Sequence, residues 1–428
     1  MFRKSSVFLF ILFYTITLSS LSNANNFSAK PILRINSDMH TAIIRQMDTD
    51  AAGKYIATCS DDKTVIIWNG NNGTRHKTLR PPIGTGRQGS LYAVAFSPDG
   101  KHVITGGWTG ASAPQNNSIY VFNVSTGEIT KTLSRISGVI TKIGFSPDGR
   151  YFVVSTGTNS GLYVYSMGDF GLKARLTGYQ GPVYGFSFSR QGQLVSTSYD
   201  GKIRLYSKNF RLIHLVETSG AMKPHGAAFS PDGKLIAVGF TDAPLVNVMN
   251  AANLSVLFRP VIRDIGNSVL TTVVWSKNGK RLYAGGTYNT VVRGLQRNIV
   301  RVWGGAGKGP FVDIPAGLNV ITDIKIMPDE SIVFSSGQPD FGKFNQSGKQ
   351  IFYKRARIFS YSGAAGNHLL VSHNGETVGF TPSLHKPFTF SIKQHQLYRK
   401  MFNGTGSTDR RENIIVSDWK NSTAPRMD

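Results

Sequence analysis

Three side chains near the start of the chain have the types that a hydrolase triad uses. His40, Ser60 and Asp62 are a potential base, nucleophile and orienting acid, and acyl transfer needs such groups within hydrogen-bonding reach of one another. Ser60 and Asp62 lie two residues apart, and the same pair recurs at Ser198 and Asp200. Because a catalytic set should not recur in degenerate form along a chain, we interpret these residues as structural and expect no catalytic residues.

The elements that must position these side chains belong to a sequence repeat. The pentapeptide Phe-Ser-Pro-Asp-Gly occurs at 96–100, 145–149 and 229–233, and degenerate copies end at 53, 192, 279 and 330. Pro favours the first central position of a type I turn, and Gly accepts the positive φ at its exit. Short alternating apolar and polar stretches flank each copy. A period of roughly 40 to 50 residues with four short strands per unit predicts propeller blades.

By this count the fold is all-β, with eight four-stranded repeats. The eighth repeat is the faintest, with strands expected at 357–361, 368–372 and 377–381. A seven-bladed ring is the alternative if this unit lies outside the ring. A strand at 31–36 is placed to complete the last blade, which would close the ring and protect its edges.

The first repeat resembles a WD40 repeat. Its residues His40, Ser60, Asp62 and Trp68 match the buried tetrad that in this family joins the strands of a blade by hydrogen bonds. The resemblance implies a WD40-like β-propeller with a structural tetrad in this blade.

Longer segments, such as 79–84, 106–110 and 197–202, are similar to bacterial exported WD40 proteins. In some of these proteins the propeller precedes a caspase-like peptidase domain. No Cys follows Cys59, so the peptidase activity is not carried over. The resemblance implies the recognition or regulatory module alone.

The first 24 residues have the pattern of a signal peptide. Arg3 and Lys4 precede an apolar run at 7–18, and small residues follow at 22–24. The run is shorter than the roughly 20 residues of a membrane-spanning helix. We therefore expect export to the periplasm or the extracellular space. A WD40-like propeller should occupy 25–402, followed at 403–428 by a linker-like tail that could be a remnant of further repeats.

The chain is strongly basic, with 48 Lys and Arg against 24 Asp and Glu. The basic residues are scattered, whereas nucleic-acid binders concentrate them on one face or helix, so we expect no nucleic-acid partner. Weak contact with anionic envelope surfaces is consistent with the charge. The dispersed His residues lack metal-ligand spacing, and we expect neither a metal nor a cofactor.

The expected partner-binding face is formed by loops between the second and third strands. Two of these loops are long, 107–118 and 286–298, and long loops on rigid scaffolds often carry function. The candidates are of types that dominate interface energetics: Trp108, Tyr199, Tyr288, Asn289, Arg293, Arg297 and Phe341.

These observations predict a non-catalytic protein-interaction scaffold or recognition module in the cell envelope, monomeric and bound to a protein partner of unknown identity. The alternative is a periplasmic hydrolase or lyase that uses the central channel. That class needs several Asp, Glu or His converging from the starts of the innermost strands. The positions that can be placed there, such as Leu91 and Val183, are mostly apolar.

Overall fold

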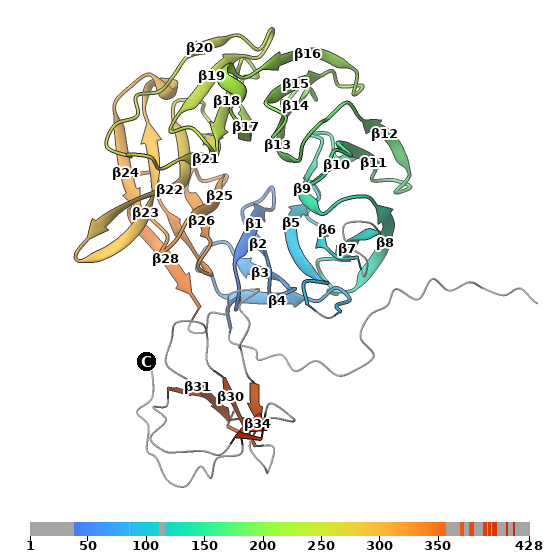
Figure 1. Cartoon of the computed structure of the whole chain (residues 1–428), viewed down its shortest axis with the longest axis vertical. Helices are drawn as coiled ribbons and strands as arrows, with labels where there is room; N and C mark the ends of the chain where they lie inside the picture. Colours follow the sequence, from blue (N-terminus) through green and yellow to red (C-terminus); the bar gives the residue numbers. More distant parts are fainter. Residues whose placement is uncertain are drawn as a thin grey trace, which may run out of the picture.

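Seven four-stranded antiparallel sheets stand around a central axis in a computed structural model of the chain (Figure 1). The structure describes residues 38–84, 86–110 and 116–356, together with 369–371, 376–380, 388–391, 393–394, 396–399, 408–409 and 414–415. Within these residues there is no α-helix, and no helix is long and apolar enough to cross a membrane.

Each blade is one continuous stretch of chain whose four strands run in order from the axis outwards. The strands of blades one to four are β1 (Ile44–Thr49), β2 (Tyr55–Ser60), β3 (Val65–Asn69), β4 (Arg75–Leu79), β5 (Ser90–Phe96), β6 (His102–Trp108), β7 (Asn117–Asn123), β8 (Ile129–Ile136), β9 (Ile140–Phe145), β10 (Tyr151–Thr156), β11 (Leu162–Ser166), β12 (Leu172–Leu176), β13 (Val183–Phe188), β14 (Leu194–Ser198), β15 (Lys202–Tyr206) and β16 (Leu212–Glu217).

Blades five to seven continue the same pattern. Their strands are β17 (Pro224–Phe229), β18 (Leu235–Phe240), β19 (Val246–Asn250), β20 (Val256–Phe258), β21 (Leu270–Trp275), β22 (Leu282–Val292), β23 (Leu295–Trp303), β24 (Phe311–Pro315), β25 (Ile321–Ile326), β26 (Ile332–Ser336), β27 (Asp340–Phe344) and β28 (Gln350–Arg355). Two 3₁₀ turns, η1 (Ser219–Ala221) and η2 (Gly305–Gly307), lie between strands.

The pentapeptide forms the turn between the first and second strand of a blade, as the sequence predicted. In the copy at 96–100, the Ser97 hydroxyl donates to the Asp99 carboxylate and accepts the amide of His102 at 2.9 Å. The Lys101 amide donates to the same carboxylate at 3.0 Å. Gly100 has a φ of +69°, a conformation that glycine adopts without strain. Ser and Asp therefore pair the backbone amides that the turn leaves without a strand partner.

The core lies between neighbouring blades. The middle strands β2 and β3 are buried almost throughout, whereas the outer strand β4 is partly exposed. Strands buried on both faces must be apolar on both faces. One such layer joins blade one to blade seven, where the rings of Trp68 and Phe341 lie 4.7 Å apart.

Among the described strands, none is exchanged where the ring closes between blades seven and one. β1 lies beside β25 and β26, the Met47 amide donates to Asp323 Oδ2 at 3.2 Å, and Lys343 Nζ donates to the Gly70 carbonyl at 3.1 Å. All four strands of blade seven come from 321–355. The ring thus has seven blades, the alternative of the sequence-based count, and not eight.

The faint eighth repeat forms a separate sheet outside the ring (Figure 1). Its strands are β29 (Leu369–Val371), β30 (Thr377–Phe380), β31 (Phe388–Ser391) and β32 (Gln396–Arg399), and β33 (Thr408–Asp409) pairs with β34 (Ile414–Ile415). The strands expected at 31–36 and 357–361 lie outside the described residues, and so does the signal sequence.

Candidate functional site

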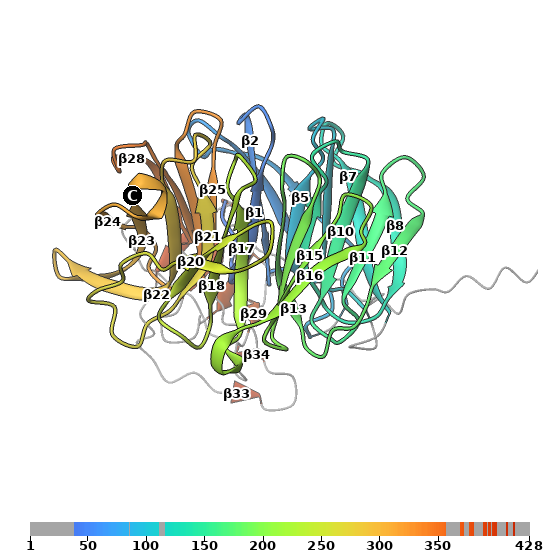
Figure 2. The same cartoon turned by 90° about the horizontal axis from the view of Figure 1, so that it is seen from above.

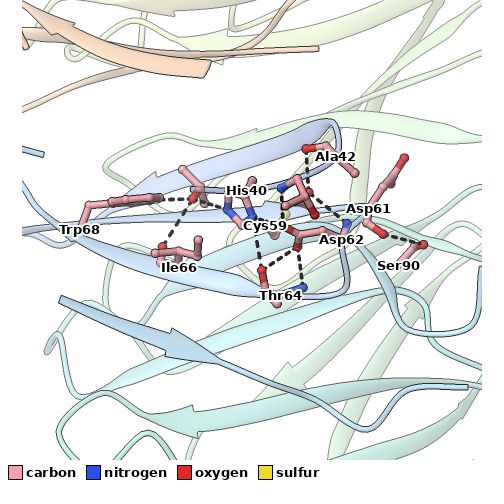
Figure 3. Close-up of polar contacts among 12 residues, drawn as sticks. His40, Ala42, Cys59, Asp61, Asp62, Thr64, Ile66, Trp68 and Ser90 are labelled. Atoms are coloured by element: carbon pink, nitrogen blue, oxygen red, sulfur yellow. Dashed lines mark hydrogen bonds and ion pairs between the residues drawn. The ribbon is translucent and has the colours of Figure 1, made fainter. Parts of the chain in front are cut away.

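Four side chains of blade one form a buried hydrogen-bonded row (Figure 3). His40 Nδ1 lies 2.9 Å from Asp62 Oδ2, and His40 Nε2 lies 2.7 Å from Thr58 Oγ1. Trp68 Nε1 donates to the same hydroxyl at 2.7 Å. The row Asp62–His40–Thr58–Trp68 therefore links the loop before β1 to β2, β3 and the turn between them.

Ser60, which the sequence placed in this row, lies beside it. Its hydroxyl donates to the Ala42 carbonyl at 2.9 Å and accepts the Asp62 amide at 3.1 Å. The side chains at positions 58 and 60 point to the same face of β2, and Thr58 is the one that reaches His40. Because Ser60 is fully buried and has no hydrogen bond to His40, it is not arranged as a nucleophile beside a base.

The row holds an ionised carboxylate. Burial alone would raise the pKa of Asp62, but the charge and hydrogen bond of His40, with the hydrogen bonds from Thr64 and a backbone amide, lower it. The Thr64 hydroxyl donates to Asp62 Oδ1 at 2.6 Å. A buried carboxylate with several donors fixes the strand ends that supply them. The chemistry of this group is that of a structural clamp.

Blade four builds the equivalent clamp from other residues. Tyr179 Oη lies 2.7 Å from Ser196 Oγ and 2.9 Å from Tyr206 Oη. The buried Arg204 guanidinium stacks 4.1 Å from the Tyr179 ring and pairs with Asp200 at 2.8 Å. Blade four thus uses a Tyr and an Arg–Asp pair where blade one uses His, Thr and Trp.

A second group of residues lies where the innermost strands begin, at one end of the central axis of the ring, which we call the channel mouth. Every innermost strand has a β-bulge near its start, and a bulge redirects the side chain that it leaves unpaired. The residues in these positions are Arg45, Tyr92, Thr141, Tyr184, His225 with Gly226, Thr271 and Thr322.

Five side chains on blades one, two, four and five make the mouth cluster: Arg45, Tyr92, Tyr184, Tyr199 and His225. The Arg45 guanidinium lies 4.8 Å from the Tyr92 ring centroid. The Tyr184 ring stacks on His225 at 5.4 Å and lies 4.6 Å from the Tyr199 ring. All four rings are half-buried. The Arg45–Tyr92 pair and the group around Tyr184 lie within electrostatic range of each other, because Tyr184 acts on Tyr92 and Arg45 acts on Tyr184.

The charges of the mouth cluster are largely neutralised. Arg45 makes a two-pronged ion pair with Asp61, at 3.0 and 2.6 Å. Burial raises the pKa of Tyr184, with Arg45 opposing it, so the phenol is protonated at neutral pH. Burial and then repulsion from Lys142 lower the pKa of His225 to about 4, and its ring is neutral. The cluster can therefore offer stacking surfaces and neutral hydrogen-bonding groups.

Further along the channel lie charged side chains of the innermost strands. Lys325 Nζ lies 3.6 Å from Asp48 and 3.9 Å from Asp323. Burial and then repulsion from Lys325 lower the pKa of Lys142 to about 8. The two carboxylates also join blades: Asp48 Oδ2 accepts the Phe96 amide at 2.9 Å, and Asp323 accepts an amide of blade one. Both acids therefore serve ring closure and inter-blade contact. In the described parts of the chain, no three His, Cys, Asp or Glu are grouped so as to hold a metal ion.

The seven residues expected on a partner-binding face fall into separate places. Tyr199 lies in the mouth cluster, and Trp108 is half-buried at the end of β6. Phe341 is fully buried between blades seven and one, packed on Trp68 and Phe352. Its assignment to the face is wrong, because β27 is a middle strand with both faces covered.

The other four residues belong to the long β22–β23 hairpin. Tyr288 packs under Arg301, with a guanidinium-to-ring distance of 5.0 Å, and Asn289 Oδ1 accepts the Gln296 amide group at 2.8 Å. Arg293 is exposed in the turn at the tip, and Arg297 donates to the Tyr353 hydroxyl at 3.1 Å. The structure does not bring these residues to the channel mouth cluster.

Sequence reasoning missed Arg45, Tyr92, Tyr184 and His225. Each is a polar or aromatic residue in the first half of an otherwise largely apolar strand that precedes a repeat turn. That common position was the available signal. The bulge that directs these side chains to the channel changes the strand register by one residue, which a period-two pattern does not reveal.

Comparison with known proteins supports the architecture. Residues 33–69, 80–123 and 171–207 match the WD40 family (WD domain, G-beta repeat). These segments contain β1–β3 of blade one, β5–β7 of blade two, and β12 of blade three with β13–β15 of blade four. The chain is similar to Pre-mRNA-processing factor 19 of Oryza sativa subsp. japonica, with 22% identity over 64% of this chain and 49% of the relative. It is also similar to WD repeat-containing protein SL1-17 of Schistosoma mansoni, at 25% identity over 38% and 50%, and to human Transducin beta-like protein 2, at 24% over 46% and 58%.

The chain thus spans about half the length of these relatives. All three come from eukaryotes, which contradicts the expected resemblance to bacterial exported WD40 proteins. With that resemblance the suggested link to caspase-like peptidases also falls. The fold itself is a WD40 β-propeller.

Proposed function

We propose that this WD40-repeat β-propeller is a non-catalytic protein-interaction scaffold whose partner binds across the mouth of the central channel. The observation that carries the proposal is the mouth cluster. Seven bulges direct side chains to the mouth, and the large ones gather on blades one, two, four and five.

The residue types of the cluster fit a binding hot spot. Tyr and Arg are enriched at the centres of protein interfaces, where partly covered rings gain most from losing their remaining water. Because Arg45 is already paired with Asp61 and His225 is neutral at physiological pH, the cluster favours an apolar or aromatic segment with backbone groups to pair. A highly charged partner segment fits it less well.

The absence of a catalytic role is also part of this proposal. The buried His, Ser and Asp of blade one are each engaged in structural hydrogen bonds. The channel carboxylates bind backbone amides of the neighbouring blade. WD40 propellers are typically non-catalytic scaffolds. These observations favour the scaffold over a hydrolase or lyase.

We also propose that the protein is exported and that its mature form begins at Asn25. The support is the order of the basic, apolar and small residues in 1–24. Mass spectrometry of the protein from its native cells should find a peptide that begins at Asn25. Recovery of the intact N-terminus from the cytoplasm would contradict the export.

Site-specific photo-crosslinking tests the binding site. Benzoylphenylalanine placed at Tyr184 in the full chain should give a discrete protein adduct in native cells, which mass spectrometry then identifies. Tyr55 is a matched control position, because its ring is also half-buried and also stacks on a histidine, His76, at 4.8 Å. It lies at the start of β2, at the opposite end of the blade from the mouth. No adduct should form there.

Binding of the identified partner should then depend on the cluster. Tyr184→Ala should weaken the affinity by about thirtyfold, as hot-spot truncations of about 2 kcal/mol do, whereas Tyr55→Ala should leave it unchanged. Equal affinity of the two variants for the partner, or an adduct at Tyr55 alone, would show that the partner does not bind at the channel mouth. Thermal melts of both variants show that each remains folded.

A further inference from the structure

The β22–β23 hairpin extends beyond the ring in both views of the molecule (Figures 1 and 2). Its strands, with 11 and 9 residues, are the longest that the structure describes. The outer half is a regular ladder from the pair Asn289–Asn298 to the pair Val292–Leu295. The turn residues Arg293 and Gly294 both have positive φ, +51° and +76°, which is the type I′ geometry that matches strand twist. The arm is therefore an ordered ribbon.

The tip of this arm exposes apolar side chains. Val291 is 69% exposed and Leu295 is 58% exposed. Leaving them in water contributes nothing to the stability of the ring, since no other described segment covers them. Other apolar side chains are as exposed, such as Val312 at 67% on an outer strand. What distinguishes Val291 and Leu295 is their place together at the end of a projecting ribbon.

The surroundings of the tip are basic. The segments 286–298 and 341–357 contain no Asp or Glu. Arg293 is exposed at the turn, and Arg297 joins the arm to Tyr353 of β28. Lys354 and Arg355 follow Tyr353 directly. Asp340, beside Tyr353, is fully buried and accepts the Tyr353 hydroxyl at 2.6 Å. At the base of the hairpin, Asp313 pairs with Arg301 at 2.8 Å, and Asp313 and Asp264 both act on Tyr288, so the carboxylates lie at the base of the arm and not at its tip.

We propose that this hairpin is a membrane-contact arm whose tip inserts into the interface of a bilayer that contains anionic lipids. The tip presents two aliphatic side chains, one on each face of the ribbon, which is far less than the surface that a stable protein interface buries. This small apolar area is sufficient for shallow insertion into a bilayer, because burial of apolar side chains and attraction of basic residues to anionic headgroups both favour membrane binding. The formal net charge of the full sequence, +24 with Arg3 and Lys4 included, acts in the same direction. This inference is independent of the partner site at the channel mouth.

Vesicle binding by the full chain tests the arm. Co-sedimentation with phosphatidylcholine vesicles that contain phosphatidylglycerol should be at least tenfold stronger than with phosphatidylcholine alone. The double substitution Val291→Ser with Leu295→Ser should reduce binding to the anionic vesicles by tenfold or more. Val312→Ser is the matched control, because Val312 is 67% exposed on the outer strand β24 and should have no effect.

A fluorescent probe reports insertion directly. The one native cysteine, Cys59, is fully buried, so an environment-sensitive dye should label Leu295→Cys selectively. Its emission should shift to the blue when anionic vesicles are added, and the emission from labelled Val312→Cys should not. Unchanged vesicle binding by the double variant, or equal shifts at both positions, would overturn the proposal. A protein adduct formed by benzoylphenylalanine placed at Leu295, together with unchanged vesicle binding by the double variant, would identify a protein partner instead.

Discussion

The hydroxyl of Thr58 is the point at which the buried row of blade one can be broken most cleanly. Thr58→Val replaces it with a methyl group of nearly the same shape. The substitution leaves two buried groups without their partner, His40 Nε2 and Trp68 Nε1, which both lie 2.7 Å from the hydroxyl oxygen. No cavity and no steric clash accompany the loss.

The expected cost follows from those two contacts. A buried polar group that loses its partner costs about 1–3 kcal/mol, so Thr58→Val, which leaves two such groups, should lower the free energy of unfolding by about 2–6 kcal/mol. Thr58→Ser keeps the hydroxyl and removes one methyl group, which costs about 1 kcal/mol. Ser60→Ala removes the donor to the Ala42 carbonyl and the acceptor of the Asp62 amide. This substitution should lower the free energy of unfolding by about 1–2 kcal/mol.

Urea unfolding followed by tryptophan fluorescence measures the three variants, because Trp68 belongs to the row. The predicted order of destabilisation is Thr58→Val first, then Ser60→Ala, then Thr58→Ser. A Thr58→Val protein as stable as Thr58→Ser would refute the reasoning, since the hydroxyl would then contribute nothing. A larger loss of stability from Ser60→Ala than from Thr58→Val would show that Ser60 is the central residue of the row, as the sequence predicted.

Three further substitutions test other parts of the ring. Burial and Lys142 lower the pKa of His225 to about 4 from an ordinary 6.5. As the pH falls, this histidine therefore binds a proton in the unfolded chain before it does so in the folded chain. Stability should therefore fall by up to about 3 kcal/mol between pH 6.5 and pH 4, and the slope measured by urea titration should be shallower in His225→Gln. Asp323→Ala removes the acceptor of the Met47 amide and should speed hydrogen exchange of that amide at least tenfold; unchanged exchange would show that the contact is not formed. Arg204→Met leaves Asp200 as a buried unpaired charge and should cost about 3–5 kcal/mol, much of which Arg204→Met with Asp200→Asn should recover in thermal melts.

The repeat made the architecture accessible from the sequence. Residues such as Ser97, Asp99 and Gly100 act within five positions of one another, so their turn follows from local chemistry. The blades then follow from the spacing of the turns. The number of blades in the ring does not, because closure depends on the packing of Trp68 on Phe341, two residues at opposite ends of the ring sequence.

The candidate site was less accessible. Thr58 and Ser60 both carry a hydroxyl on the same face of β2, and no pattern in the sequence distinguishes which one reaches His40. Phe341 has the residue type of an interface anchor, but its burial is set by blade one, which lies almost the whole ring away in sequence. Tyr184 and His225 meet only because bulges on adjacent inner strands direct both to the channel.

Closure of the ring at the seam between blades seven and one does not depend on which blade comes first in the chain. Each blade is a contiguous stretch of chain, and the seam is held by side chains such as Lys343 and Asp323 reaching backbone groups of blade one. Contacts of that kind, including the bond from Phe96 to Asp48, also join blades one and two. No strand has to be shared for the circle to hold. The chain could therefore begin at any blade and still place the blades in the same circular order. A circular permutant opened between any two blades would contain the same seven units in the same circle.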